Sequence, residues 1–166
     1  MPRIYLPNLR IIITMKAIFS HRLKHLRDNI GVTQKETAAH LNISISLYRY
    51  FERESAKNMP SIPTLVGMSF LFHTSTDYLL GLSENQIKES SKVFKFSKST
   101  FVATLRKIRS SQKLTQSEMA DKIGLSLRLY QYYESTLSNT FPSYTNLINI
   151  AARLDITIDC LLGLND

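Results

Sequence analysis

The sequence contains one cysteine, five glycines, five prolines and no long apolar run. A single thiol, Cys160, excludes an internal disulfide and a cysteine-based metal cluster, and it fits a reducing compartment. The apolar residues at 11–13 are far fewer than the roughly 20 that a membrane-spanning helix needs, and the N-terminus has no apolar region of the signal-peptide kind. The composition therefore predicts a globular, cytoplasmic protein with no membrane segment.

The net charge of +8 is concentrated outside two blocks of the chain. Residues 19–82 and residues 101–164 each carry 7 Lys and Arg against 5 Asp and Glu. Most of the excess lies at residues 1–18 and 83–100, which contain Arg3, Arg10 and several lysines. A basic arm and a basic linker favour an anionic partner such as nucleic acid. Solvating charge on exposed segments is the alternative interpretation.

An internal repeat runs through the sequence at a constant offset of 82 residues. Thr33-Gln34 recurs as Thr115-Gln116, and the segment 79–82 recurs as 161–164, within 20 identities over 64 ungapped positions. We therefore expect an N-terminal arm at 1–18, one unit at 19–82, a linker at 83–100 and a second unit at 101–166. We interpret residues 1–14 as an extra arm or an extension upstream of a start at Met15. We expect the segment 93–96 to pack on a unit as a short strand or an extended segment, and the stretch before it is compatible with an extension of a helix.

Hydrophobic spacing and capping residues predict five short helices in each unit, because strand signals are nearly absent. An apolar stripe indicates a first helix that ends at Gly31: Phe19, Leu23, Leu26 and Ile30. Capping boxes at 33–36 and 115–118 begin the second helices. Serine caps begin the third and fourth helices, at Ser44, Ser61, Ser126 and Ser143. Fifth helices ending at Gly81 and Gly163 complete an all-α fold.

Several of these features occur together in each copy: Thr-Gln-x-Glu-x-Ala, a Ser-capped helix, a helix-ending Glu, a following Pro-Ser and a terminal Leu-Leu-Gly-Leu. Both copies thereby resemble the lambda-repressor-like, Cro/CI-type (XRE-family) helix-turn-helix domain. The resemblance implies two tandem five-helix domains. It also implies that the third helix of each enters the major groove of double-stranded DNA. The function implied is a sequence-specific transcriptional regulator, a repressor of phage or mobile-element type.

The third helix supplies the candidate base-reading residues. Its helical wheel points Tyr48 and Phe51 toward the core and leaves six polar or aromatic candidates outside: Ser46, Arg49, Tyr50, Arg128, Gln131 and Tyr132. Arginine can pair with guanine, and glutamine can pair with adenine. Candidate phosphate contacts are Gln34, Arg53, Lys57 and Gln116, the two glutamines because they match the family's phosphate-binding position. The resemblance also implies two structural ion pairs, Arg27 with Glu52 and Arg109 with Glu134.

Two departures from the family pattern favour an alternative. The first outward position of the third helix is Ile45 or Leu127, which can contact a thymine methyl group or a protein. The glycine that often follows the helix-ending Glu is replaced by Glu54 or Thr136. The alternative is a protein-binding module, in which one or both units mediate dimerisation or sequester a protein.

One chain can act as a pseudo-dimer on two half-sites, and a homodimer and a protein regulator are further candidate partners. The sequence has no Gly-rich phosphate loop and no Cys/His or His/Asp cluster with metal-ligand spacing. We therefore expect no enzyme activity, no cofactor and no metal site.

Overall fold

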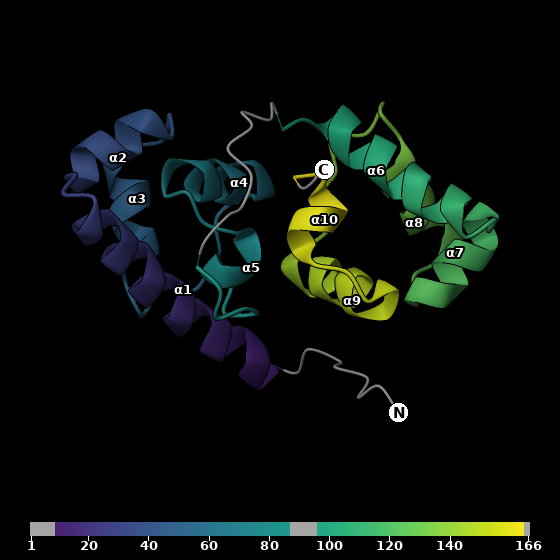
Figure 1. Ribbon diagram of the computed structural model, residues 1–166, viewed down its shortest axis with the longest axis horizontal. Helices are drawn as coiled ribbons and strands as arrows, with labels where there is room; N and C mark the ends of the chain where they lie inside the picture. Colours follow the sequence, from purple (N-terminus) through teal and green to yellow (C-terminus); the bar gives the residue numbers. More distant parts are fainter. Residues whose placement is uncertain (1–8, 87–95, 165–166) are drawn as a thin grey trace. The chain divides into compact units, whose positions relative to one another are not determined.

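The computed structural model describes residues 9–86 and 96–164, and every regular element in these ranges is a helix. The all-α class predicted from the sequence is therefore confirmed for the described residues. The chain divides into two compact units. We call residues 9–86 the N-terminal unit and residues 96–164 the C-terminal unit. Figure 1 colours the first from purple to teal and the second from green to yellow.

Five helices form the N-terminal unit: α1 (Leu9–Asn29), α2 (Gln34–His40), α3 (Ile45–Phe51), α4 (Ile62–Leu71) and α5 (Thr76–Leu79). In this unit α2 packs against α3, and α5 contacts both α1 and α4 (Figure 1). The C-terminal unit contains α6 (Lys98–Ser111), α7 (Gln116–Ile123), α8 (Leu127–Glu134), α9 (Tyr144–Leu154) and α10 (Ile158–Leu162). Here α7 packs on α8 and α9, and α10 packs on α6 and α9.

Side-chain caps begin the second to fifth helices of both units. Each cap hydroxyl accepts a hydrogen bond from the backbone N–H three residues further on, which satisfies a donor that the helix leaves unpaired. The caps lie at positions related by the offset of 82: Thr33, Ser44, Ser61 and Ser75, then Thr115, Ser126, Ser143 and Thr157. Such a cap contributes about 1 kcal/mol. The capping boxes and serine caps predicted from the sequence are present.

Left-handed backbone positions recur with the same offset. The positive φ angles among the described residues form four pairs: Gly31 with Lys113, Asn42 with Gly124, His73 with Asp155, and Gly81 with Gly163. In all four pairs the φ values of the two members differ by less than 20°, for example 69° at Gly124 and 52° at Asn42. The chain therefore changes direction in the same way at corresponding points of both units.

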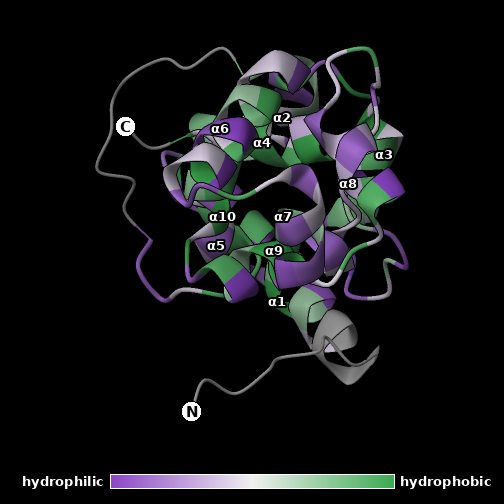
Figure 2. Cartoon of the chain, turned by 90° about the vertical axis from the view of Figure 1, so that its right-hand side faces the viewer, coloured by the Kyte–Doolittle hydropathy of each residue, from purple (hydrophilic) through white to green (hydrophobic). Residues whose placement is uncertain are grey.

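The core of each unit is built from the predicted apolar stripes. Phe19, Leu23 and Leu26 of α1 are at most 3% exposed, and Leu65 and Met68 of α4 are fully buried. Burying one side chain of this size contributes about 1.5–3 kcal/mol. In Figure 2 many helices are green along one side and purple along another, as expected for helices that cover such cores. Ile30 was expected to extend the first stripe, but it is 48% exposed because α1 ends at Asn29.

The first helix begins earlier than the repeat boundaries predict. α1 starts at Leu9, so the boundary placed between residues 18 and 19 falls inside a helix. Met15 lies within this helix and is only 5% exposed, because its side chain joins the core. The rest of the predicted arm, residues 1–8, lies outside the described residues.

The predicted linker also overlaps a helix, since Ser97 caps α6 and the helix begins at Lys98. Most of the segment 93–96 lies outside the described residues. Its last member, Phe96, packs on Phe141 with 5.5 Å between the ring centroids. Cys160 is a free thiol and is partly exposed.

Candidate nucleic-acid interface

The candidate surface in each unit is a pair of short helices joined by a tight turn. In the N-terminal unit the turn between α2 and α3 spans residues 41–44, and in the C-terminal unit the turn between α7 and α8 spans 124–126. Gly124 occupies the left-handed position of the second turn, where a residue without Cβ has no steric penalty. The N–H of Thr33 donates to Glu36 at 2.8 Å, and Thr115 makes the same bond to Glu118. The second helix therefore begins with the same capping box in both helix pairs.

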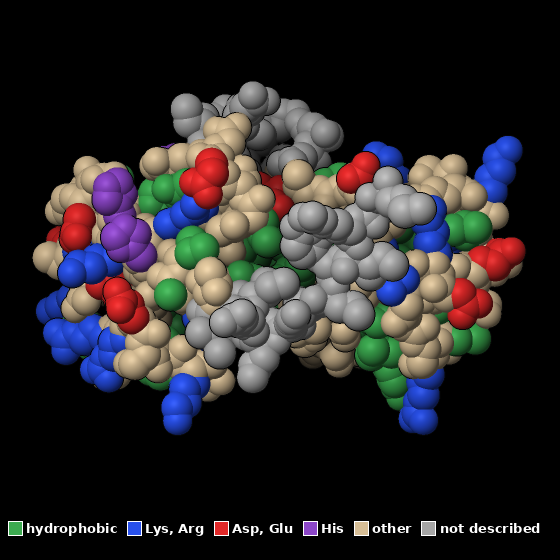
Figure 3. Space-filling model, turned by 90° about the horizontal axis from the view of Figure 1, so that it is seen from below, with side chains coloured by type: hydrophobic (Ala, Val, Ile, Leu, Met, Phe, Trp, Pro, Cys, Tyr) green, Lys and Arg blue, Asp and Glu red, His purple; other side chains and the backbone are tan. Residues whose placement is uncertain are grey.

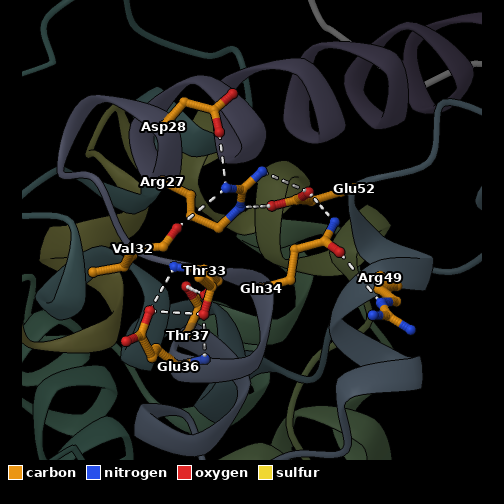
Figure 4. Close-up of polar contacts among 9 residues, drawn as sticks. All are labelled: Arg27, Asp28, Val32, Thr33, Gln34, Glu36, Thr37, Arg49 and Glu52. Carbon is orange, nitrogen blue, oxygen red and sulfur yellow. Dashed lines mark hydrogen bonds and ion pairs between the residues drawn. The ribbon is translucent and has the colours of Figure 1, made fainter.

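A buried carboxylate ties the first, second and third helices of the N-terminal unit together (Figure 4). Arg27 Nε donates to Glu52 Oε1 at 2.6 Å, and Gln34 Nε2 donates to Glu52 Oε2 at 2.7 Å. The guanidinium also reaches the carbonyl of Val32 at 3.2 Å. Burial would raise the pKa of Glu52, but hydrogen bonds from Arg27 and Gln34 outweigh it and lower the pKa below its ordinary value. Glu52 therefore remains ionised at neutral pH.

The C-terminal unit repeats this network with one additional bond. Arg109 Nε donates to Glu134 Oε1 at 2.7 Å, and Gln116 Nε2 donates to Glu134 Oε2 at 2.6 Å. The hydroxyl of Tyr130 adds a bond to Glu134 Oε1 at 2.8 Å. Glu134 is 2% exposed, and its pKa is lowered because these bonds offset the cost of burial. The geometry places both predicted ion pairs where they fix the third helix against the first.

The two candidate phosphate-binding glutamines, Gln34 and Gln116, face these carboxylates. An amide nitrogen carries two hydrogens, and in each glutamine one of them is used by the glutamate. The oxygen Oε1 of Gln34 accepts a further bond from Arg49 Nε at 3.2 Å. The second amide hydrogen of each glutamine is not used in the bond to the glutamate, and that bond sets the orientation of the side chain.

Most candidate base-reading side chains lie on the exposed side of the third helix. Tyr48, Phe51, Tyr130 and Tyr133 are at most 5% exposed, as the helical wheel requires. The opposite side of the third helices presents four exposed polar residues, Ser46, Arg49, Arg128 and Gln131, and Arg53 is exposed just after the end of α3. Tyr132 is 45% exposed and Leu127 is 41% exposed. The aromatic side chains of the third helix therefore pack in the core, and its polar side chains face solvent.

Tyr50, a candidate base-reading residue, is held by the loop that follows α3. Its side chain is only partly exposed, and its hydroxyl accepts hydrogen bonds from the N–H groups of Lys57 at 2.7 Å and Asn58 at 2.9 Å. The ring also packs edge-on against Phe51. These contacts hold the loop after α3, so Tyr50 presents less polar surface than its equivalent, Tyr132. The Lys57 side chain remains exposed in that loop.

Two lysines that the sequence did not single out hold the loops that follow α3 and α8. Lys16 Nζ donates to the carbonyl of Lys57, and Lys98 Nζ donates to the carbonyls of Tyr133 at 3.0 Å and Thr140 at 2.6 Å. Lys16 and Lys98 are themselves 82 residues apart. Extending the repeat a few residues before Phe19 would have found them.

Charge on the molecular surface is mixed. In Figure 3 Lys and Arg side chains project from both units, with acidic side chains among them. Within residues 9–86 and 96–164, no group of three His, Cys, Asp or Glu residues is arranged to hold a metal ion. None of the described helices is long and apolar enough to cross a membrane.

Comparisons with known proteins agree with the geometry of the C-terminal unit. A family model described as helix-turn-helix matches residues 105–159. The uncharacterized HTH-type transcriptional regulator YqaE of Bacillus subtilis is 45% identical over 62 residues, which is 37% of this chain and 52% of the relative. The HTH-type transcriptional regulator ImmR of the same organism is 44% identical over 63 residues, covering 38% and 48%.

The cryptic phage CTXphi transcriptional repressor RstR of Vibrio cholerae is 49% identical over 49 residues, covering 30% of this chain and 42% of the relative. The chain spans about half the length of the curated relatives it matches. No solved structure matches. The family match begins within α6 and ends within α10, so residues 105–159 of this chain contain one helix-turn-helix domain.

Proposed function

We propose that the chain is a sequence-specific DNA-binding regulator of transcription, a repressor of phage or mobile-element type. The observation that carries the proposal is α8, which lies inside the matched range. It exposes Arg128, Gln131 and Tyr132 on one side, and Tyr130 and Tyr133 anchor its other side in the core. A helix fixed in this way can present base-reading side chains with little loss of conformational entropy. The names of the relatives, regulators and a phage repressor, support the same function.

The N-terminal unit acts as a second helix-turn-helix domain in this proposal. Three structural features recur there at the offset of 82: the helix caps, the left-handed positions and the buried Arg–Glu–Gln network. One chain then offers two reading helices, α3 and α8, as a covalent pseudo-dimer on double-stranded DNA. A homodimer would offer four.

The residues divide into two roles. Arg49, Arg128 and Gln131 read base edges, because a guanidinium pairs with guanine O6 and N7 and an amide pairs with adenine N6 and N7. Phosphates are contacted by the second amide hydrogens of Gln34 and Gln116 and by the exposed cations Arg53 and Lys57. The buried glutamates fix the orientation of the two glutamines. The base-contacting and phosphate-contacting side chains are therefore held in fixed positions relative to one another.

Selection of bound duplexes from a random DNA pool tests the function with the full chain. We expect an enriched sequence whose affinity falls steeply with salt, with a log–log slope of about −0.9 for each phosphate neutralised. Absence of any enrichment, together with weak binding that ignores sequence, would contradict the proposal.

A matched set of variants separates the two roles. Arg128→Ala should lose about 1–3 kcal/mol of discrimination at one base pair and little affinity for random duplex. Gln116→Ala should weaken binding to selected and random duplexes alike, because it removes a phosphate contact. Lys107→Ala removes one positive charge from an exposed position of α6 and serves as the charge-matched control. Equal effects of Arg128→Ala on both duplexes would contradict the division.

One observation favours a second candidate, a protein-binding module that dimerises or sequesters a partner. Leu137 is 97% exposed in the loop after α8, and Leu127 at the start of the same helix is 41% exposed. Apolar side chains that face solvent can contact a protein partner when they form part of a larger apolar patch. If the selection yields no DNA sequence, Leu127→Ser and Leu137→Ser in a binding assay with a protein partner are the variants that test this candidate.

A further inference from the structure

The two reading helices carry different side chains at equivalent positions. Ser46 of α3 corresponds to Arg128 of α8, and Arg49 corresponds to Gln131, each pair being 82 residues apart. All four side chains are exposed. Because the second and third helices of both units are capped by the same types of residue at the same spacing, these pairs occupy the same places on the two units.

The chemistry of the two pairs selects different bases. At the place held by Arg49 and Gln131, the N-terminal unit favours guanine and the C-terminal unit favours adenine. At the place held by Ser46 and Arg128, the C-terminal unit favours guanine, whereas a serine hydroxyl can bond to more than one base. The two units therefore favour different half-sites.

The support of these side chains also differs. Arg49 Nε is held by Gln34 Oε1, whose amide nitrogen is held in turn by buried Glu52. Arg128 is held from its own helix, with Nη2 3.3 Å from the hydroxyl of Tyr132 and the guanidinium 5.8 Å from the ring centroid. In the N-terminal unit the side chain of Arg49 is therefore held in place by Gln34 and, through it, by the buried Glu52.

A third difference concerns the tyrosines. Tyr132 is 45% exposed beside Arg128, whereas the Tyr50 hydroxyl is committed to the backbone of Lys57 and Asn58. The C-terminal unit therefore presents three side chains to the bases, Arg128, Gln131 and Tyr132, and the N-terminal unit presents mainly Arg49.

We propose that the DNA target of one chain is a composite, non-palindromic site made of two unlike half-sites. This inference rests on the proposed function. The half-site of the C-terminal unit carries guanine at the position read by Arg128 and adenine at the position read by Gln131. The half-site of the N-terminal unit carries guanine at the position read by Arg49 and is less restricted at the position facing Ser46.

The test is selection from a random pool with the full chain, at concentrations where one chain binds one duplex, verified by native mass spectrometry. We expect an enriched site with two unlike halves. Replacing the adenine read by Gln131 should lower affinity about 5- to 140-fold, which corresponds to about 1–3 kcal/mol for one bidentate contact. Replacing the base that faces Ser46 should lower affinity less.

A double variant, Arg128→Ser with Gln131→Arg, gives the C-terminal unit at these two positions the side chains that the N-terminal unit carries there. Its selected site should change in one half only, toward the half-site of the N-terminal unit. Lys107→Ala should select the same site as the unmodified chain. Circular dichroism of each variant checks that the helices are retained.

The possible results distinguish failure of the composite-site proposal from failure of the proposed DNA-binding function. A palindromic or directly repeated site, a single half-site, or a double variant that selects the original site would overturn the inference while leaving DNA binding in place. No enrichment and no salt-dependent binding by the unmodified chain would overturn the proposed function itself, and the inference with it.

Discussion

Tyr48 and Tyr130 occupy equivalent positions of α3 and α8, and both are fully buried. Their hydroxyls differ. Tyr130 donates to Glu134 Oε1 at 2.8 Å, whereas the hydroxyl of Tyr48 lies near Glu52 and Thr37 without a hydrogen bond of normal geometry. Replacing each tyrosine by phenylalanine removes one oxygen and leaves the ring in place. Comparing the two variants therefore measures how much each hydroxyl contributes to the stability of its unit.

The expected effects have different sizes. Hydrogen bonds to a charged group contribute about 1.5–3 kcal/mol. Glu134 would keep its bonds from Arg109 and Gln116, so Tyr130→Phe should lower the free energy of unfolding of the C-terminal unit by about 1.5–2 kcal/mol, the lower part of that range. A buried hydroxyl without a partner costs free energy in the folded state. Tyr48→Phe should therefore leave the N-terminal unit unchanged or more stable by up to about 1 kcal/mol.

Hydrogen exchange of the full chain, measured by mass spectrometry on peptides from α3 and α8, reports the two units separately. A single unfolding curve would not, because two units can unfold in separate steps. The slowest amides of α8 exchange through unfolding of the whole unit, so Tyr130→Phe should speed them about 10- to 30-fold. Amides of α3 should keep their rates in this variant and should not speed up in Tyr48→Phe.

Equal acceleration in both variants would refute this reasoning, since it would mean that the Tyr48 hydroxyl is bonded as strongly as that of Tyr130. No acceleration in Tyr130→Phe would refute it too, because the bond to Glu134 would then contribute nothing.

Three other predictions follow from the same structure. The pKa of Glu134 in the folded chain is lowered from its ordinary value of 4.5. The ionised carboxylate therefore stabilises the fold above pH 4.5, and this stabilisation is lost as pH falls through the lower folded pKa. Acid unfolding followed by circular dichroism should depend less on pH in Glu134→Gln than in the unmodified chain. Gly81 has a φ of 74°, and a Cβ there would lie 2.8 Å from the Ile18 side chain, whereas Gly31, at a φ of 71°, has open space around it. Thermal melting should show Gly81→Ala more destabilised than Gly31→Ala, which loses about 1 kcal/mol from backbone strain alone, and equal losses would contradict the contact. Lys57→Ala should reduce the salt slope of DNA binding by about 1 without altering the selected sequence, as fluorescence anisotropy across salt concentrations would measure.

Several features of the site were predictable from the sequence, because local rules and the repeat determine them. Thr33, Ser44 and their equivalents are caps whatever lies beyond the helix they begin, since the bonds span only three residues. The inward positions of Tyr48 and Phe51 follow from helical periodicity. The Arg27–Glu52 pair is a long-range contact, and it was predicted only through the resemblance of both copies to a known domain.

The exact start of the first helix was not predictable in this way. The repeat and the apolar stripe begin at Phe19, but α1 begins at Leu9 and buries Met15. Helix ends depend on what the flanking turn can pack against, which no local pattern before Phe19 records.

Apart from the start of α1 and the contacts of Tyr50, the sequence by itself determined the helices, their caps, the buried faces and the outward residues of α3 and α8, because each depends on neighbours a few positions away along the chain. Only the tertiary structure decided which polar groups meet. It turned one amide hydrogen of Gln34 toward Glu52, directed the Tyr50 hydroxyl to the backbone of Lys57 and left Tyr48 without the bond that Tyr130 makes. These outcomes depend on distances between segments far apart in sequence, where a shift of about 1 Å separates a hydrogen bond from none.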